Sequence, residues 1–531
     1  MLYFRHLILS IINISLIFSL VYAKEKPIIV FSGADTANLI EPHTFRSTSA
    51  YMVTHHVFEP LIRQKMINDN GLLIGSREIH LGTGSESYSI NETSDGGFLG
   101  VFKIRKNQTF ADGRQVTAKD YKYMFDRSIK GPGYIGLLLP FIGISDVNQI
   151  SLTDEMTLQI KTNVKSPLFE RFMTFQVFGA LNMVEAKNNS NNEDPWAFEY
   201  YKNKSGGSGP YYVGKFSPDS EVVLKPNPGY WNADKIPNGG LILKAIPDSN
   251  ERARLVSSGF IDVAGGIPPK LLSKLKNDSN VKVYNRPSSG VVYLAMNQTI
   301  KVMKNINLRR AIVHAVPYSE LINNVMYGYA SPAGGVVTSS METYDNNIGN
   351  QFSKDLNKAR KYLKDSGIND PKLLLGVRES RLEDQEAAVL IQDSLRKVGI
   401  SIEIQILPDG DFGNRINKNE LPLFIHDWYS WGEDPFYQMM FLSTCGQWVN
   451  YARFCNKEYD KLVKEGAFTL DNTKRNSLSS KAQRIFYSEA VWAPLWSADR
   501  TIVTNKCVNG LSIGYSSIAD MKMMSKKSNC N

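Results

Sequence analysis

Long apolar runs are absent after the first 23 residues of this 531-residue chain. A bilayer-spanning helix needs about 20 predominantly apolar residues, so no membrane span is expected in the remainder. The one apolar stretch, residues 7–21, follows Arg5 and His6 and is interrupted by polar residues. It ends at Val21-Tyr22-Ala23, a pattern that fits the positions a signal peptidase reads. Residues 1–23 are therefore predicted to be a cleavable signal peptide.

Cysteine is also scarce. The four cysteines Cys445, Cys455, Cys507 and Cys530 all lie in the last fifth of the chain. None forms the Cys-x-x-Cys pair that is typical of a structural zinc site. In an exported protein an even number of cysteines indicates disulfides, and four cysteines allow three pairings. We expect Cys445–Cys455 and Cys507–Cys530, because these pairings close the shortest loops.

Clusters of basic residues are missing as well. The formal net charge is +9, but lysines and arginines are scattered along the chain, so nucleic-acid binding is not expected. The G-x-S-x-G turn of many serine hydrolases is absent too. Neither observation favours a nucleic-acid-binding protein or an enzyme.

Residues 206–231 carry a near miss for a phosphate-binding loop. Residues 209–215 spell G-x-x-x-x-G-K, but Phe216 stands where a Mg²⁺ site needs Ser or Thr. Pro210 has no N–H for a phosphate, and the Tyr-Tyr-Val that follows prefers extended backbone. We instead predict a flexible Gly/Ser segment that leads into a strand, a turn at 217–220 and a second strand over 221–225.

The remaining pattern is mixed α/β. A chain of this length is too long for one core, so two or three domains are expected. Residues 373–377 form a short apolar run, and residues 383–398 carry apolar positions at helical spacing. Isoleucines then alternate with polar residues over 400–406, so a strand–helix–strand unit is predicted. Thr117 and Asp120 form a capping-box pattern at the start of another helix.

Several short elements resemble the large extracytoplasmic solute-binding proteins of ABC importers, the class that includes dipeptide- and oligopeptide-binding proteins. They are FEPL at 58–61, TFADG with VTAKD between 109 and 120, GSGPYY at 207–212, KPNPGYW at 225–231, and the segments 308–315 and 325–332. Each is short, but together they follow the family's order over nearly the whole mature chain.

The resemblance implies an α/β, bilobal fold of the periplasmic-binding-protein type II, or Venus flytrap, with an accessory domain. Lobe I would combine residues 24–67, 207–292 and 499–531, the accessory domain would be residues 68–206, and lobe II would be residues 293–498. Two crossing strands would form a hinge between the lobes. A ligand that contacts both lobes would stabilise the closed state.

The resemblance also points to a ligand-binding arginine. Arg378 follows the strand at 373–377, and its distance in sequence from Gln392 resembles the spacing of a carboxylate-binding arginine in dipeptide-binding relatives. A guanidinium suits that role because its planar fork meets both carboxylate oxygens. Arg381 is the alternative position. The alternative interpretation is a solvated arginine whose neighbours neutralise it.

The segment HDWYSWGEDP at 426–435 resembles the one that supplies the amine-binding aspartate of peptide binders. Counted back from Asp434, that position is Trp431 here. Tryptophan does not pair with an ammonium as a carboxylate does, although its ring face attracts cations. This departure favours capped, modified or longer ligands over an ordinary dipeptide. The candidate contacts in this segment are Asp427, Trp428, Ser430, Trp431 and Asp434, with Glu433 as a further carboxylate; packing is the alternative role for both tryptophans.

We therefore expect the substrate-binding component of an ABC importer, which is not an enzyme and needs no cofactor or metal. It would act as a monomer in the periplasm and deliver a peptide or other small solute to the transmembrane subunits of a permease. A non-peptide ligand (a metal chelate, haem, an oligosaccharide or a modified peptide) and a periplasmic receptor or chaperone role are alternatives. A secreted hydrolase is the remaining class.

Overall fold

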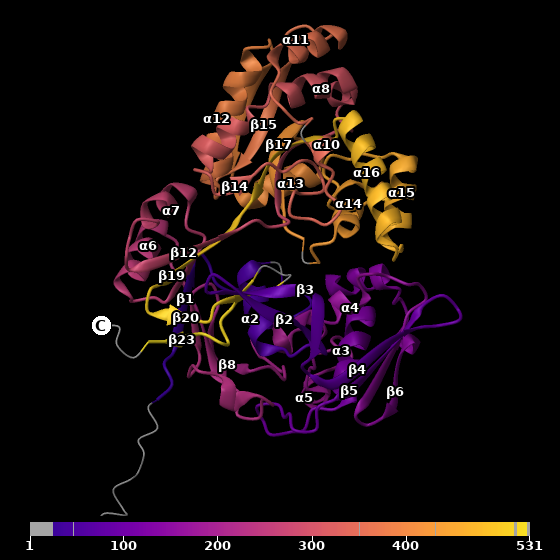
Figure 1. Cartoon of the computed structure of the whole chain (residues 1–531), viewed down its shortest axis with the longest axis vertical. Helices are drawn as coiled ribbons and strands as arrows, with labels where there is room; N and C mark the ends of the chain where they lie inside the picture. Colours follow the sequence, from indigo (N-terminus) through magenta and orange to yellow (C-terminus); the bar gives the residue numbers. More distant parts are fainter. Residues whose placement is uncertain (1–24, 46, 350, 431, 515–517, 528–531) are drawn as a thin grey trace, which may run out of the picture.

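Two lobes lie one above the other in the computed structural model, which describes residues 25–45, 47–349, 351–430, 432–514 and 518–527 (Figure 1). The predicted signal peptide, Trp431 and Cys530 lie outside these described residues. The upper lobe is formed by the middle and later part of the chain, whereas the lower lobe combines its beginning with its end.

A seven-stranded sheet organises one side of the lower lobe, in the order β12-β19-β11-β1-β10-β9-β8. β1 is parallel to both β10 and β11, and the other neighbours are antiparallel. Its elements are β1 (Ile29–Gly33), β8 (Tyr211–Ser217), β9 (Glu221–Pro226), β10 (Leu241–Ala245), β11 (Val263–Gly265), β12 (Val281–Arg286) and β19 (Arg500–Asn505), with helices α6 (Ser249–Ser258) and α7 (Pro269–Leu275).

The rest of the lower lobe contains two four-stranded sheets, β4-β5-β7-β6 and β2-β3-β21-β22. The strands are β2 (Ile62–Asp69), β3 (Leu72–Gly82), β4 (Ser85–Glu92), β5 (Phe98–Ile104), β6 (Ile150–Asp154), β7 (Thr157–Lys161), β21 (Ser512–Ile513) and β22 (Ala519–Asp520), and β20 (Val508–Asn509) pairs with β23 (Ser525–Lys526). The helices are α2 (Thr48–Val57), α3 (Ala118–Lys130), the 3₁₀ helix η1 (Tyr134–Ile142), α4 (Phe169–Phe172) and α5 (Met183–Asn188). The predicted capping box is confirmed at the start of α3, where the Thr117 N–H donates to the Asp120 carboxylate at 2.9 Å.

A six-stranded sheet forms the centre of the upper lobe, in the order β14-β18-β13-β17-β15-β16. Every residue of β13 is buried, as expected of an interior strand with helices on both faces. The strands are β13 (Val291–Met296), β14 (Ala330–Ser331), β15 (Lys372–Arg378), β16 (Ser401–Leu407), β17 (Leu423–Trp428) and β18 (Trp492–Ala498). The helices are α8 (Ile306–Ala315), α9 (Tyr318–Glu320), α10 (Asn346–Gly349), α11 (Leu356–Asp365), α12 (Leu382–Arg396), α13 (Asp409–Asn417), α14 (Pro435–Ser443), α15 (Lys457–Ala467) and α16 (Asn472–Ser488).

The predicted strand–helix–strand unit is confirmed as β15–α12–β16. The two strands are parallel, and α12 buries Ala387, Ala388, Ile391 and Leu395 on one side. β15 ends at Arg378, and its parallel neighbour β17 ends at Trp428. Parallel strands end at the same edge of a sheet, so Arg378 and the end of β17 lie at one edge of the upper lobe's sheet.

Two neighbouring chain segments join the lobes. Residues 287–290 connect β12 to β13, and Asp499 connects β18 to β19. β12 is the antiparallel partner of β19 in the lower lobe, and β13 is the antiparallel partner of β18 in the upper lobe. The two crossings therefore run side by side. The Ser497 hydroxyl donates to the carbonyl oxygens of Ser288 and Gly290, each at 2.9 Å. These bonds fix the two crossings to each other next to the space between the lobes.

Both strands predicted within residues 206–231 are confirmed as β8 and β9, but the expected role of the preceding glycines is wrong. Gly207 and Gly209 are buried, and a Cβ on either would collide with the carbonyl group of Val57 at the end of α2. The Gly209 N–H donates to that carbonyl oxygen at 2.7 Å. These glycines therefore permit close packing of two backbones and do not supply flexibility.

Candidate ligand-binding site between the lobes

A cavity of about 420 Å³ lies between the two lobes beside the hinge. The lower lobe contributes the segments after β10, around α7 and at the start of β19. The upper lobe contributes residues 380–383, Tyr429 and Trp496. The volume falls within the range of small-molecule sites. Because its walls come from both lobes, a solute in this cavity contacts both.

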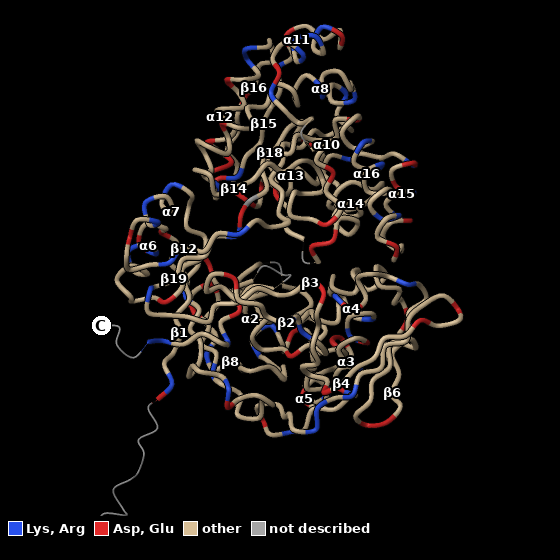
Figure 2. The backbone as a smooth tube through the Cα atoms, viewed as in Figure 1, with Lys and Arg blue, Asp and Glu red and all other residues tan. Residues whose placement is uncertain are grey.

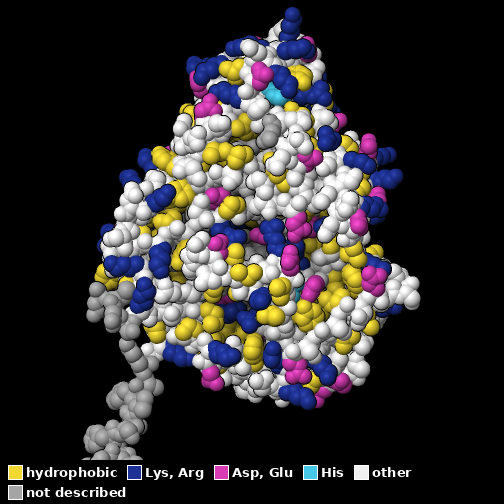
Figure 3. All heavy atoms as spheres, in the orientation of Figure 1, with side chains coloured by type: hydrophobic (Ala, Val, Ile, Leu, Met, Phe, Trp, Pro, Cys, Tyr) yellow, Lys and Arg dark blue, Asp and Glu magenta, His cyan; other side chains and the backbone are white. Residues whose placement is uncertain are grey.

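Charged residues lie along the backbone where the two lobes meet (Figure 2), and Figure 3 shows side chains of both signs at that level on this face of the molecule. Within the cavity wall, three arginines stand against two carboxylates: Arg252, Arg381, Arg500, Glu383 and Asp499. The excess of guanidinium groups suits an anionic or carboxylate-bearing solute.

The predicted Arg378 lies beside this cavity in a network of four charged groups. Its guanidinium donates a hydrogen bond to Asp427 on the adjacent strand β17 and lies 3.6 Å from Asp384 of α12. Arg381 lies 3.5 Å from Asp427 and 4.0 Å from Asp384. Arg381 also lines the cavity, whereas the cavity wall does not include Arg378, Asp384 or Asp427.

The pKa values of the two carboxylates of this network are shifted in opposite directions. Burial alone would raise the pKa of Asp427, but Arg381 and Arg378 outweigh burial and hold that pKa well below its usual value. For Asp384 burial dominates over the same arginines and raises the pKa to about 6. Asp427, followed by Asp384, raises the pKa of Arg381 further above its usual value. Asp427, which contacts both guanidinium groups, is therefore ionised at neutral pH and orients both of them.

Tyr429 and Arg500 were not predicted from the sequence, and they form the part of the wall nearest the hinge. The Arg500 guanidinium lies 4.0 Å from the centroid of the Tyr429 ring, and its buried Nε has no hydrogen-bond partner among the residues that the structure describes. Gly290 of the hinge leaves room for the ring, because a Cβ there would collide with it. Arg500 lies across the hinge from β17, so no local sequence pattern marks it.

Arg252, the third arginine of the wall, is also new. Its guanidinium donates to the carbonyl oxygens of Pro247 and Gly266 at 2.9 and 2.6 Å. Burial lowers its pKa. Arg252 therefore holds two loops of the lower lobe in place and shapes this side of the cavity.

The remaining predicted residues are placed differently. Asp434 is only 2% exposed; it accepts hydrogen bonds from the N–H groups of Phe436 and Tyr437 at the start of α14, and one from Arg475 at 2.6 Å. These contacts use its carboxylate within the upper lobe. Ser430 is buried, and its hydroxyl has no hydrogen-bond partner in the part of the chain that the structure describes. Trp431, the residue at the amine-binding position, lies outside the described residues.

Two arginines of the lower lobe make further contacts with the upper lobe. Arg77 of β3 lies 3.1 Å from the carboxylate of Glu433 in the upper lobe. Arg171 of α4 donates to the carbonyl oxygen of Gly432 and lies 3.6 Å from Glu342. Burial raises the pKa of Glu433, with Arg77 and Arg171 acting in the opposite direction.

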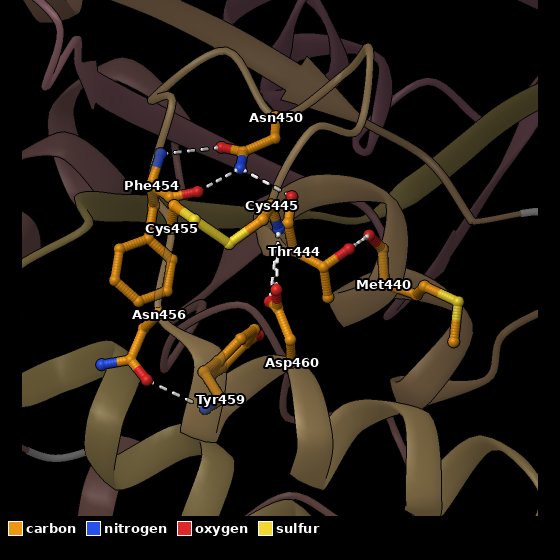
Figure 4. Close-up of a disulfide and its surroundings, with 9 residues drawn as sticks. All are labelled: Met440, Thr444, Cys445, Asn450, Phe454, Cys455, Asn456, Tyr459 and Asp460. Atoms are coloured by element: carbon orange, nitrogen blue, oxygen red, sulfur yellow. Dashed lines mark hydrogen bonds between the residues drawn. A yellow bond between two sulfur atoms is a disulfide. The ribbon is translucent and has the colours of Figure 1, made fainter.

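The predicted disulfide Cys445–Cys455 is confirmed and closes a ten-residue loop after α14 (Figure 4). Asn450 ties the same loop internally, since its amide donates to the carbonyl oxygens of Thr444 and Phe454 at 2.9 and 2.7 Å. The Asp460 carboxylate accepts from the Cys445 N–H at 3.2 Å. The second predicted pairing involves Cys530, which lies outside the described residues.

Comparison with known families decides the class of protein. The sequence model described as "Bacterial extracellular solute-binding proteins, family 5 Middle" matches residues 86–450. The chain belongs to this family. Family 5 binding proteins are periplasmic or extracellular. Among the described residues, no helix combines the length and apolar character needed to cross a membrane.

Individual family 5 proteins resemble the chain over most of its length. It is 26% identical over 495 residues to "Probable D,D-dipeptide-binding periplasmic protein DdpA" of Escherichia coli (strain K12), covering 92% of each chain. It is 23% identical over 445 residues to "Oligopeptide-binding protein OppA" of Bacillus subtilis (strain 168), covering 79% of this chain and 80% of OppA.

Solved structures show the same fold. The structure of DppA from Helicobacter pylori in complex with the peptide STSA has a TM-score of 0.80 at 21% identity and covers 94% of this chain and 98% of DppA. The Escherichia coli murein tripeptide binding protein MppA has a TM-score of 0.78 at 18% identity, with coverage of 95% and 99%. The predicted bilobal type II fold is confirmed.

Proposed function

We propose that this family 5 protein is the extracytoplasmic substrate-binding component of an ABC importer. It captures a peptide or peptide-like solute between its two lobes and delivers it to the transmembrane subunits of a permease. The observation that carries this proposal is the interlobe cavity, which has walls from both lobes and an excess of arginines. The names of relatives, which refer to D,D-dipeptides, oligopeptides and glutathione, support a peptide-like ligand.

The mechanism follows from differential contact. A solute that touches both walls has more contacts when the lobes are closed than when they are apart, so binding shifts the population toward the closed state. Arg381, held by Asp427 and Asp384, presents its guanidinium to the ligand carboxylate. The closed shape is the signal that the permease recognises.

The proposal includes a cleavable signal peptide at residues 1–23, a periplasmic location and a monomer. Its domains are lobe I at 24–67, 207–292 and 499–531, an accessory domain at 68–206 and lobe II at 293–498. The two chain crossings at 287–290 and 499 support a hinge between these lobes.

Native mass spectrometry of the purified protein, followed by calorimetric titration with the peptides it releases, tests this function. We expect a ladder of peptide masses and saturable one-to-one binding without turnover. One discrete non-peptide mass would contradict a peptide ligand, and peptide hydrolysis would contradict a binding role. Loss of peptide uptake on gene deletion distinguishes an importer component from a receptor or chaperone, for which uptake would be unchanged.

A further inference from the structure

A second cavity, of about 460 Å³, adjoins the arginine-lined cavity. It contains no charged side chain in its wall, which is made of Tyr134, Leu137, Leu138, Trp428, Tyr429, Tyr437, Phe441 and Trp448. Tyr429 belongs to the walls of both cavities, so a solute that follows this ring passes from a cationic to an apolar environment.

The two sides of this aromatic cavity come from different parts of the molecule. Helix η1 of the lower lobe supplies Tyr134, Leu137 and Leu138. The end of β17, helix α14 and the loop closed by the disulfide supply the upper-lobe side. Phe441 of this wall stacks on Phe141 of η1, with ring centroids 4.8 Å apart. A group in this cavity therefore also contacts both lobes.

Two features of the wall show unmet interactions. Leu137 is 58% exposed and Trp448 is 52% exposed, although both face an apolar cavity. The indole N–H of Trp428 is buried and donates no hydrogen bond among the described residues. Exposed apolar groups that line a cavity and an unpaired buried donor are typical of surfaces that a ligand completes.

The groove continues beyond this cavity. A third cavity of about 490 Å³ shares Leu137, Phe441 and Trp448 with it and reaches Cys445 and Asp460. The Cys445–Cys455 disulfide and the hydrogen bonds of Asn450 fix this wall (Figure 4). A wall that is already ordered lowers the cost of binding.

We propose that the aromatic cavity is a specificity subsite for a large aliphatic or aromatic side chain of the bound peptide. The inference rests on the proposed function and names its substrate class: short peptides that carry a carboxylate near Arg381 and a bulky apolar residue beside Trp428 and Phe441. A charged side chain is excluded because it would lose its hydration among eight uncharged groups.

A random library of tripeptides to pentapeptides tests the subsite, with capture by the purified protein and sequencing of the bound fraction by mass spectrometry. The parent protein should enrich aromatic and large aliphatic residues at one peptide position by at least about tenfold over the input. Leu137→Glu should lose this enrichment and favour Lys or Arg there instead. The variant should fold, because Leu137 is largely exposed.

Leu81→Glu is the matched control, since Leu81 is 40% exposed and lines none of the three cavities. It should retain the parent's preference. A parent that binds peptides with the composition of the input at every position would overturn the subsite and leave the proposed function standing. Unchanged apolar preference in Leu137→Glu would also overturn it. A parent that captures no peptide would overturn the proposed function itself.

Discussion

Arg378 and Arg381 share the carboxylates of Asp384 and Asp427, but only Arg381 also lines the interlobe cavity. Arg378 is the closer partner of Asp427 and is 17% exposed. Its removal leaves two carboxylates with one guanidinium inside the upper lobe, and breaking such a pair is costly. We therefore propose that Arg378 is a positioning residue and that Arg381 contacts the ligand.

We expect Arg381→Ala to weaken peptide binding by at least about tenfold, because a charge-assisted hydrogen bond to a carboxylate is lost. Arg378→Ala should instead lower the free energy of unfolding by about 3 kcal/mol. Calorimetry and urea unfolding measure the two effects, with exposed Arg396→Ala on α12 as the control. Full affinity in Arg381→Ala would show that its guanidinium does not contact the ligand.

His56 is expected to make the protein sensitive to acid. Its ring is buried, its Nδ1 lies 2.8 Å from the Met52 carbonyl oxygen, and its Nε2 accepts the Met521 N–H at 3.0 Å. Burial lowers its pKa to about 4, with His55 acting in the same direction. The unfolded chain binds a proton below pH about 6.5 that the folded chain does not. Stability should therefore fall as the pH drops from that value toward 4.

Because of this histidine, the free energy of unfolding should fall by about 1.4 kcal/mol for each pH unit between about pH 6.5 and pH 4. Urea unfolding at several pH values measures the slope for the parent and for His56→Gln. The glutamine variant should show a smaller slope, because its side chain does not titrate. Equal slopes in both proteins would mean that His56 carries a proton in the folded state.

At the residue scale, the sequence predicted some of the residues that lie at the candidate site. The pattern of β15 and the segment 426–435 predicted Arg378, Arg381 and Asp427, which the structure brings together. Tyr429, Arg500 and Arg252 were missed, because these three residues lie in distant parts of the chain and only the fold brings them to one cavity. Asp434 was predicted to contact the ligand, but its carboxylate caps the start of α14 by accepting hydrogen bonds from backbone N–H groups.

At the scale of elements, alternation and helical spacing predicted the unit β15–α12–β16 and the hairpin β8–β9, because these signals are local. The glycines before β8 could not be interpreted from their neighbours. Glycine is needed at these positions because the carbonyl group of Val57 on α2 packs against them, and only the folded chain brings this group close.

The disulfide loop after α14 should contribute stability to the upper lobe and order to the apolar groove. Removing a crosslink across a loop of this length costs about 2–3 kcal/mol in the chain-entropy account. We expect the double variant Cys445→Ala, Cys455→Ala to unfold at lower urea concentration and to bind peptides with bulky apolar residues more weakly. Asn450→Ala is the matched variant that keeps the crosslink. An unaltered urea midpoint in the double variant would contradict this role.

At the scale of the whole molecule, we expect the ionic contacts between the lobes to influence closure. Glu433 contacts Arg77 across the boundary between the lobes. Its pKa is raised because burial disfavours the carboxylate more than the nearby arginines stabilise it. Separation of the lobes exposes it. Closure is therefore favoured as the pH falls through the raised pKa toward the ordinary glutamate value of about 4.3, and disfavoured as the pH rises.

Small-angle scattering of the ligand-free protein should show a smaller radius of gyration at pH 5 than at pH 7. The Glu433→Gln variant should have the smaller radius of gyration at both pH values, since the Arg77 guanidinium still donates to the Ser340 carbonyl oxygen at 3.2 Å. Glu458→Gln, at an exposed position on α15, should behave as the parent. Expansion of the parent on acidification, or an expanded Glu433→Gln, would reverse the assigned sign.

A crystal structure of the protein with a captured peptide would show directly where the ligand binds. We expect a peptide between the lobes, in contact with Tyr429 and with both cavity walls, and with its carboxylate within hydrogen-bond distance of Arg381. A peptide bound on the outer surface of one lobe, with the interlobe cavity left to solvent, would contradict this expectation.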